Sequence, residues 1–274
     1  MPTYDEILVF ILFISLLLWE YKRGQYRNNP RSPQEWFIDA MGITQLLIIK
    51  PIVILTAFGL GLALLPEQHN SLQDMPFWLG LALVFIPDDF SHYWIHRLAH
   101  DHPFLWGAHR THHTPTVYQT SIAFRENWLW YVIMPGFWWT GLMVYLGLIE
   151  QVILSTAIIG VHNVWLHKAK LGNTTAHSRR FIGKIVIALE YIFNTPSLHR
   201  GHHGLGNNGV PEGNYGQTLS IWDVIFRTAT FNKGKTPDYY GTSNPVSMAQ
   251  PWYYQLWWPI FTKKKEITEK LSLR

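Results

Sequence analysis

The 274-residue chain contains no cysteine. Disulfides, thiolate zinc sites, iron–sulfur clusters and cysteine nucleophiles are therefore excluded together, and any bound metal must use nitrogen or oxygen ligands. The chain also lacks a dinucleotide-binding glycine loop, and its net charge is only +4 with no basic recognition stripe. Nucleic-acid binding is not expected from such a charge distribution.

Apolar residues are gathered into long blocks, which predict membrane-spanning helices because a bilayer core requires about 20 apolar residues per helix. The blocks are Ile7–Trp19, Trp36–Leu65, the run after Pro76, and Trp128–Lys168, which is expected to fold as a helical hairpin. Lys50-Pro51 interrupts the second block and predicts a kink or two shorter helices. The first block lacks signal-peptide features and is expected to be an uncleaved span.

Basic residues are distributed unevenly around these blocks. Lys22–Arg31, Lys168–Lys184 and the tail Lys263–Lys265 are basic, whereas the Glu67–Asp74 connection and the turn at Glu150 carry no lysine or arginine. Because short cytoplasmic loops are enriched in these cations, the pattern predicts cytoplasmic histidine clusters. The expected fold class is all-α: a multi-span helical membrane protein, integral and multi-pass, with a cytoplasmic histidine-rich cap.

Half of the fourteen histidines fall between His92 and His113. In the first cluster His92, His96 and His100 recur every fourth residue, so on a helix they share one face and two imidazoles can converge on one ion. Asp89 lies on roughly the same face, where its carboxylate is expected to accept the second N–H of a ligand ring.

Two further clusters, His109–His113 and His199–His203, both have the form H-x-x-H-H. Each supplies three imidazoles within about a turn and a half of helix. With His96 and His100 they make eight imidazoles. Eight suits two ions, each with room for oxygen or water, better than one closed tetrahedral site.

Other interpretations explain less of the pattern. The H-E-x-x-H signature of zinc proteases is absent, because no glutamate follows His92 or His96. A transport pathway would distribute polar residues through the spans, whereas these clusters lie at span ends and in loops. A non-catalytic membrane protein that binds zinc for structure or sensing is the alternative that stays open.

The motifs resemble those of the fatty acid hydroxylase and sterol desaturase superfamily of membrane di-iron enzymes. The resemblance covers Asp88–Thr228 and rests on the stretches Asp89–His100, Trp106–His113 and Thr195–Gly204, followed by Asn214–Phe226. It divides the chain into N-terminal membrane-anchor helices (residues 1–75), a catalytic domain carrying the histidine boxes (76–230) and a C-terminal cytoplasmic tail (231–274).

The resemblance also implies a ligand set. The metal ligands carried over by motif are His96, His100, His109, His112, His113, His199, His202 and His203, with His162 as a further ligand. His92 matches a histidine of the methylsterol oxidase branch and is expected to lie beside the ligands, with the alternative that it substitutes for His100 as a ligand. His167 and His177 are interpreted as surface residues, with contact to the metal as the alternative. No catalytic residue beyond the metal site is expected.

The activity implied is hydroxylation or desaturation of a lipid C–H bond, with two iron ions as cofactor and dioxygen as co-substrate. Because the chain carries no haem-binding domain, flavin motif or ferredoxin-like cysteine set, electrons are expected from a separate reductase or carrier protein. The other expected partners are the membrane and a lipid: a sterol, a fatty acid or a related molecule. Sequence does not choose among these lipids, or between hydroxylation and desaturation.

Overall fold

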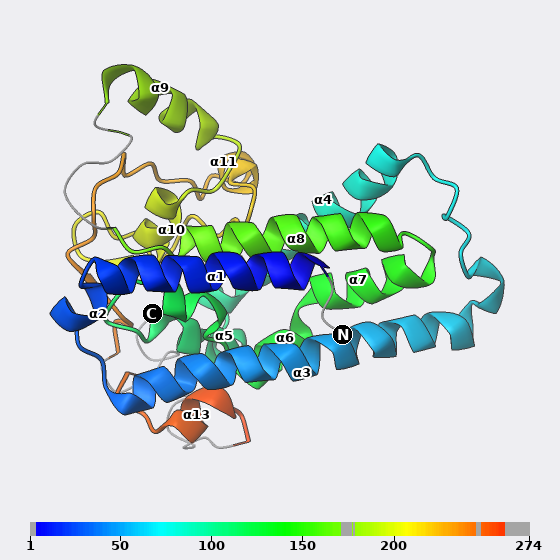
Figure 1. Ribbon diagram of the computed structural model, residues 1–274, viewed down its shortest axis with the longest axis horizontal. Helices are drawn as coiled ribbons and strands as arrows, with labels where there is room; N and C mark the ends of the chain where they lie inside the picture. The colour runs from blue at the N-terminus through cyan, green and yellow to red at the C-terminus, as the bar shows by residue number, and fades with distance from the viewer. Residues whose placement is uncertain (1–3, 171–176, 178, 245–247, 261–274) are drawn as a thin grey trace.

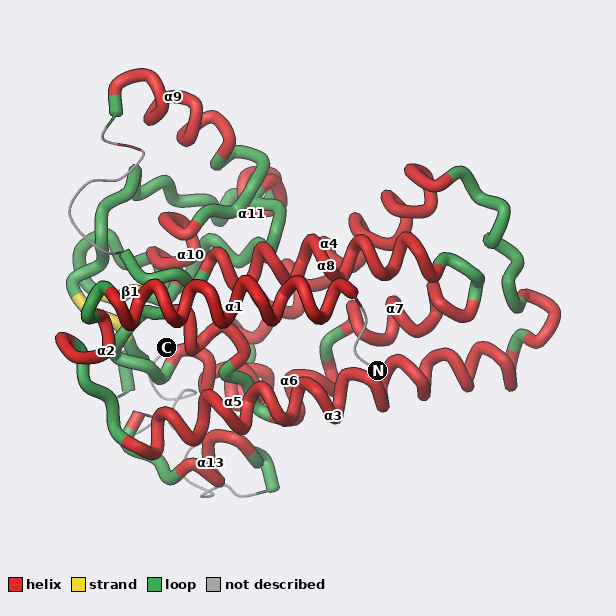
Figure 2. Tube along the Cα trace, in the orientation of Figure 1, coloured by secondary structure: helices red, strands yellow, loops and turns green. Residues whose placement is uncertain are grey.

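The structure is a computed structural model that describes residues 4–170, 177, 179–244 and 248–260. Its regular structure is almost wholly helical (Figures 1 and 2). The α-helices are α1 (Tyr4–Lys22), α2 (Gln25–Asn28), α3 (Pro33–Leu64), α4 (Phe77–Asp101), α5 (Pro103–His113), α6 (Trp128–Ile133), α7 (Pro135–Tyr145), α8 (Ile149–Leu166), α9 (Arg180–Leu189), α10 (Pro196–His202), α11 (Ile221–Ile225) and α13 (Trp252–Leu256). The other elements are two 3-10 helices, η1 (Pro66–Gln68) and η2 (Thr120–Phe124), and two short antiparallel strands, β1 (Gly204–Leu205) and β2 (Tyr239–Tyr240).

Long apolar helices form one half of the molecule (Figure 1). Helix α7 packs against both α3 and α4, and α8 packs against α1 and α4. Gly141 on α7 permits a close approach to α3, because a Cβ atom there would lie 2.4 Å from the carbonyl oxygen of Ile54.

Helix α3 is a single element of 32 residues that continues through Pro51. It begins with a capping box in which Ser32 and Glu35 satisfy each other's backbone N–H groups, and Pro33 occupies the first turn. Of the two arrangements expected at Lys50-Pro51, the structure therefore excludes a pair of shorter helices. One proline removes one hydrogen bond, which the packing of a long helix between its neighbours tolerates.

The expected hairpin within residues 128–168 is present, but its first arm is divided into α6 and α7. Pro135 lacks an amide N–H and shifts the residue before it out of the helical region. Met134 accordingly has φ −64° and ψ 112°, so α6 ends there and α7 begins anew with Pro135 at its first position.

Within the described residues, α3 and α8 are the two helices long and apolar enough to cross a bilayer by length and composition. Much of α3 faces outward, since the side chains of Leu47, Leu55 and Leu64 are each more than 60% exposed. Such a continuous apolar surface is unusual on a soluble monomer and is expected to contact lipid or another apolar partner.

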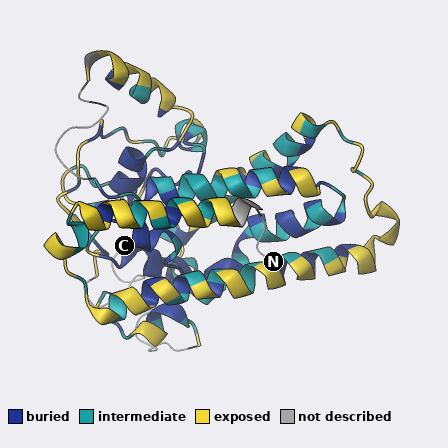
Figure 3. Ribbon diagram, viewed as in Figure 1, coloured by how far each residue is buried: buried dark blue, intermediate teal, exposed yellow. Residues whose placement is uncertain are grey.

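The other half of the molecule contains the buried segments around α5 and α10 (Figure 3), and their buried residues include polar side chains such as His109, Arg110 and Arg200. The segment that contains α13 packs against α3 and α5. Trp258 lies so close to Gly107 on α5 that a Cβ atom there would be 2.4 Å from its ring. Residues 248–260 thus support the histidine-bearing helix, whereas Lys263–Lys265 fall outside the described residues.

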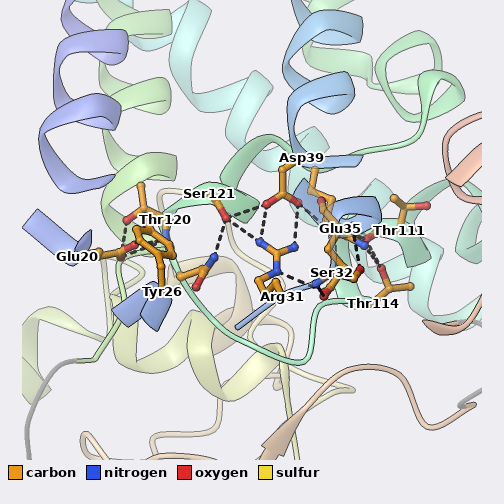
Figure 4. Close-up of polar contacts among 12 residues, drawn as sticks. Glu20, Tyr26, Arg31, Ser32, Glu35, Asp39, Thr111, Thr114, Thr120 and Ser121 are labelled. Atoms are coloured by element: carbon orange, nitrogen blue, oxygen red, sulfur yellow. Dashed lines mark hydrogen bonds and ion pairs between the residues drawn. The ribbon is translucent and has the colours of Figure 1, made fainter. Parts of the chain in front are cut away.

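A buried network of charges joins the two halves (Figure 4). Arg31 and Arg125 both bind the Asp39 carboxylate of α3, with shortest N–O distances of 2.6 and 2.9 Å. Arg125 Nε also donates to the carbonyl of Thr111, inside the second histidine cluster, at 3.1 Å. Because breaking a buried ion pair leaves an uncompensated charge, this network fixes α5 against α3.

Candidate metal centre

Nine histidines gather in two groups whose donor nitrogens lie within 4.8 Å of one another inside each group. The first group is His96, His100, His109, His113 and His202. The second group is His112, His167, His199 and His203. All of these residues except the partly exposed His100 are buried.

Helical spacing explains how each H-x-x-H-H cluster serves both groups. Residues four apart share a helix face, whereas the residue between them points elsewhere. His109 and His113 therefore enter the first group, while His112 enters the second. In α10 the division is reversed, because His202 enters the first group, and His199 and His203 enter the second.

The Nε2 atoms of the second group converge. His167 Nε2 lies 3.2 Å from that of His112 and 3.1 Å from that of His199. His199 Nε2 is in turn 3.2 Å from His203 Nε2. Two nitrogens each about 2.1 Å from one ion have such a separation when they subtend roughly a right angle. The donor spacing therefore fits a single ion.

Backbone carbonyls orient three of the rings. His96 Nδ1 lies 2.7 Å from the carbonyl oxygen of Tyr215, and His202 Nδ1 lies 2.8 Å from that of Gly213. His167 Nδ1 has the same relation to the carbonyl of Asn163, at 2.8 Å. An Nδ1–H donated in this way leaves Nε2 as the free lone pair. Nε2 of His96 and of His202 is buried without a hydrogen-bond partner in the described part of the chain, as expected of an atom that holds a metal.

Glu126 faces rings of both groups from the segment between η2 and α6. Its Oε1 lies 3.3 Å from Nδ1 of His112, and its Oε2 lies 3.7 Å from Nδ1 of His109. A carboxylate beside the outer nitrogen of a ligand ring fixes its tautomer and orientation. The sequence gives no sign that Glu126 orients a ligand ring, because only the fold brings its carboxylate to the second histidine cluster.

Asp89 does not contact an imidazole, so the partner expected for it was wrong. Its carboxylate accepts hydrogen bonds from the backbone N–H of Thr218 and Leu219 and from the indole of Trp222, at 2.9 to 3.1 Å. The segment that carries these groups also contains Tyr215, whose carbonyl faces His96. Asp89 therefore supports the centre through that segment.

The structure places the remaining histidines as follows. His162, expected as a ligand, lies outside both groups and packs against Trp165, with ring centroids 5.3 Å apart. His167, expected at the surface, is fully buried in the second group. The two are five residues apart, which turns their side chains about 140° from each other around a helix. The one signal in the sequence for a metal-binding role of His167 is its position at the end of an apolar block.

His92 lies beside the ligands, as expected, with its ring 5.6 Å from that of His96. His177 is distant from both groups and pairs with Glu190, Nε2 to Oε1 at 2.9 Å.

Burial keeps these imidazoles neutral. Desolvation, followed by repulsion among neighbouring rings, lowers the pKa well below its ordinary value for His109, His112, His113, His199, His202 and His203. Burial lowers the pKa of His167 to about 4. Neutral imidazoles are the form that binds metal, so the centre is ready for cations at pH 7.

A cavity of about 160 Å³ adjoins both groups. Its lining includes four cluster histidines and Glu126, apolar residues such as Met134, Phe137 and Ile159, and the charged residues Lys50 and Asp88. The cavity therefore extends from the histidines between the long helices, where an apolar chain can enter.

Comparison with known proteins agrees with this site. The family model named fatty acid hydroxylase matches residues 81–228, more than half of the chain. The chain belongs to the fatty acid hydroxylase family. The superfamily that the motifs resemble is thereby confirmed.

Individual relatives of this family member include lipid-modifying enzymes. Alkylglycerol monooxygenase of Xenopus tropicalis is 31% identical over 70% of this chain and 40% of its own length. The Homo sapiens alkylglycerol monooxygenase is 32% identical over 61% of this chain and 34% of its own length. Ornithine lipid hydroxylase OlsE of Rhizobium tropici is 28% identical over 72% of this chain and 54% of its own length. The chain thus spans well under two thirds of these relatives, and no solved structure matches it.

Proposed function

We propose that this protein is a membrane-bound di-iron oxygenase that uses dioxygen and external electrons to oxidise a C–H bond of a lipid. The observation that carries the proposal is the position of two histidine groups at the inner end of a cavity between apolar helices. A ligand-rich metal pair next to an apolar cavity is what oxidation of a hydrocarbon chain requires.

The donor sets favour iron over zinc. The first group brings five imidazoles together, more than the four ligands that a structural zinc ion accepts. Imidazole-rich sites with more than four positions suit iron, which also has the redox chemistry that zinc lacks. Iron bound in this site would, once reduced, activate dioxygen, which is the oxidant for C–H cleavage.

The chain's own residues would hold the metal ions, orient the ligand rings and exclude water from the site. The nine histidines would hold the two ions, and Glu126 and the carbonyls of Tyr215, Gly213 and Asn163 orient the rings. Trp130 and Phe137 line the cavity and would keep the reacting carbon away from water.

The membrane arrangement is part of the proposal. Helices α3 and α8 would cross the bilayer, and α1, α4 and the α6–α7 pair would complete the membrane half. At about 1.5 Å per residue, α3 is long enough to cross a core about 30 Å thick and extend beyond it. The basic connections favour the cytoplasmic side for the histidine groups, where a separate reductase or carrier could deliver electrons. Residues 1–75 would anchor the chain, residues 76–230 would form the catalytic domain, and residues 231–274 would lie in the cytoplasm.

The substrate is proposed as a lipid that combines a polar head with a long chain. Relatives named for alkylglycerol and for ornithine lipid support this class. Their names also favour hydroxylation over desaturation as the first outcome to examine.

The experiment compares lipid extracts from cells that express the protein with extracts from cells that express the His112→Ala variant, both grown under ¹⁸O₂. A lipid that carries one ¹⁸O atom and appears only with the unaltered protein is the expected result. Identical extracts, together with purified protein that retains zinc and consumes no oxygen with reductant, would favour the zinc-binding alternative.

A further inference from the structure

Two residues of opposite charge line the same cavity as the histidines. Lys50 projects from α3 and Asp88 from α4, and both contribute to the cavity wall that also contains His96, His109 and Glu126. Lys50 lies near the middle of α3, with apolar neighbours on both sides along the chain. Charged residues inside apolar helices are costly and usually mark a functional site.

Lys50 and Asp88 do not neutralise each other by contact. Among the described residues, no ion pair or side-chain hydrogen bond involves either group. Both groups therefore remain available to a ligand in the shared cavity.

Local packing holds Asp88 in place. Its Oδ1 atom lies against Gly136, in the first turn of α7, where a Cβ atom would be only 1.9 Å from that oxygen. The N-terminus of a helix favours a negative charge, so the carboxylate is tolerated there. Lys50 is half-buried and lies on another helix, and its ammonium has no side-chain partner among the described residues.

Resting on the proposed lipid-oxidising function, we propose that Lys50 and Asp88 bind a hydroxyl group of the lipid substrate and so select neutral lipids with a free hydroxyl. A hydroxyl can donate its hydrogen to the Asp88 carboxylate and accept one from the Lys50 ammonium at the same time. A fatty-acid carboxylate could accept a hydrogen bond from Lys50 but has no hydrogen to donate to Asp88, and a plain hydrocarbon would leave both groups without partners.

The test measures equilibrium binding to iron-loaded protein in nanodiscs without oxygen, so that no turnover occurs. The probes are radiolabelled 1-O-hexadecylglycerol and its 2,3-dimethyl ether, which has the same chain and oxygens but no hydroxyl hydrogen. The diol is expected to bind the unaltered protein at least about tenfold more tightly than the ether, the effect of a hydrogen bond to a charged group.

Asp88→Asn and Lys50→Met are each expected to weaken diol binding about tenfold and to leave binding of the ether nearly unchanged. Asp74→Asn and Lys184→Met, at exposed positions outside the cavity, are the matched controls and should change neither. Two irons per chain in every variant would show that the centre is intact. Equal binding of both probes, or an equal loss of both in the variants, would overturn the proposal. Because binding is measured without oxygen, absence of lipid oxidation would count against the proposed function alone.

Discussion

The rings of His113 and His203 stack with centroids 4.4 Å apart and planes 20° apart, although the two residues belong to different groups. His113 ends α5, and His203 directly follows α10. This contact makes the two groups neighbours. A change in one group is therefore expected to affect the other through packed rings, so each variant requires a count of bound ions beside an activity measurement.

Removing one ligand from either group tests the assignment. His202→Ala, in the first group, and His112→Ala, in the second, are each expected to reduce iron to about one ion per chain and activity by more than about 100-fold, since even changes beside a ligand cost 10–100-fold. Membrane insertion should persist, because these residues lie outside α3 and α8. His69→Ala, next to Phe58 at the far end of α3, should leave both values unchanged. Normal turnover in both box variants would show that the ligand assignment is incorrect.

His167 and His162 provide a matched comparison. His167→Ala should remove an ion from the second group, because its Nε2 converges with those of His112 and His199. His162→Ala should retain both ions, since that ring lies outside the groups. Metal analysis of the two purified variants separates them. Loss of metal in His162→Ala with full metal in His167→Ala would reverse the assignment.

Glu126 is expected to act as a positioning residue for both groups. Glu126→Ala should lower metal affinity about 10–100-fold, because the outer nitrogens of His112 and His109 lose a shared acceptor. Glu126→Gln keeps one acceptor oxygen and should lose less. Chelator competition measures the affinity, and Glu150→Gln, at an exposed position on α8, is the control. Unchanged metal affinity in Glu126→Ala would exclude this role.

The metal-free protein should lose stability as the pH falls below about 6.5. An unfolded histidine titrates near pH 6.5, whereas burial lowers the folded pKa of His167 to about 4 and that of the six α5 and α10 ligands well below the ordinary value. The unfolded state therefore takes up protons first. Burial raises the pKa of Glu126 and of Asp223, and these two groups have the opposite effect, but seven histidines outweigh them. Unfolding temperatures of metal-free protein between pH 7.5 and 4.5 should fall steadily, and a rise would contradict this balance.

The proposed orientation can be tested with single cysteines, because the chain contains none. Gln68→Cys and Asn207→Cys place thiols at exposed positions in η1 and after β1. A membrane-impermeant thiol reagent applied to intact cells should label Gln68→Cys and leave Asn207→Cys unlabelled. The reverse pattern would put the histidine groups on the outer side, away from cytoplasmic reductants.

The sequence was sufficient for features that depend on local spacing. Apolar blocks located the long helices, and the four-residue and H-x-x-H-H intervals identified eight of the nine clustered histidines. The helix break before Pro135 could have been predicted, because the residue before a proline is disfavoured in a helix. It was missed because residues 128–168 were interpreted as one continuous hairpin. Asp89 and His167 obtain their roles from partners 32 to 133 residues away, and Glu126 obtains its role from the packing of separate segments. No local interval encodes such contacts.

The central claim is that each chain holds two iron ions in the two histidine groups. Quantitative metal analysis of detergent-purified protein that is active on lipid, combined with Mössbauer spectroscopy of ⁵⁷Fe-loaded samples, tests it most directly. The account predicts about two irons per chain, since five and four imidazoles gather at two neighbouring points. One ion or fewer per chain in fully active protein would contradict it.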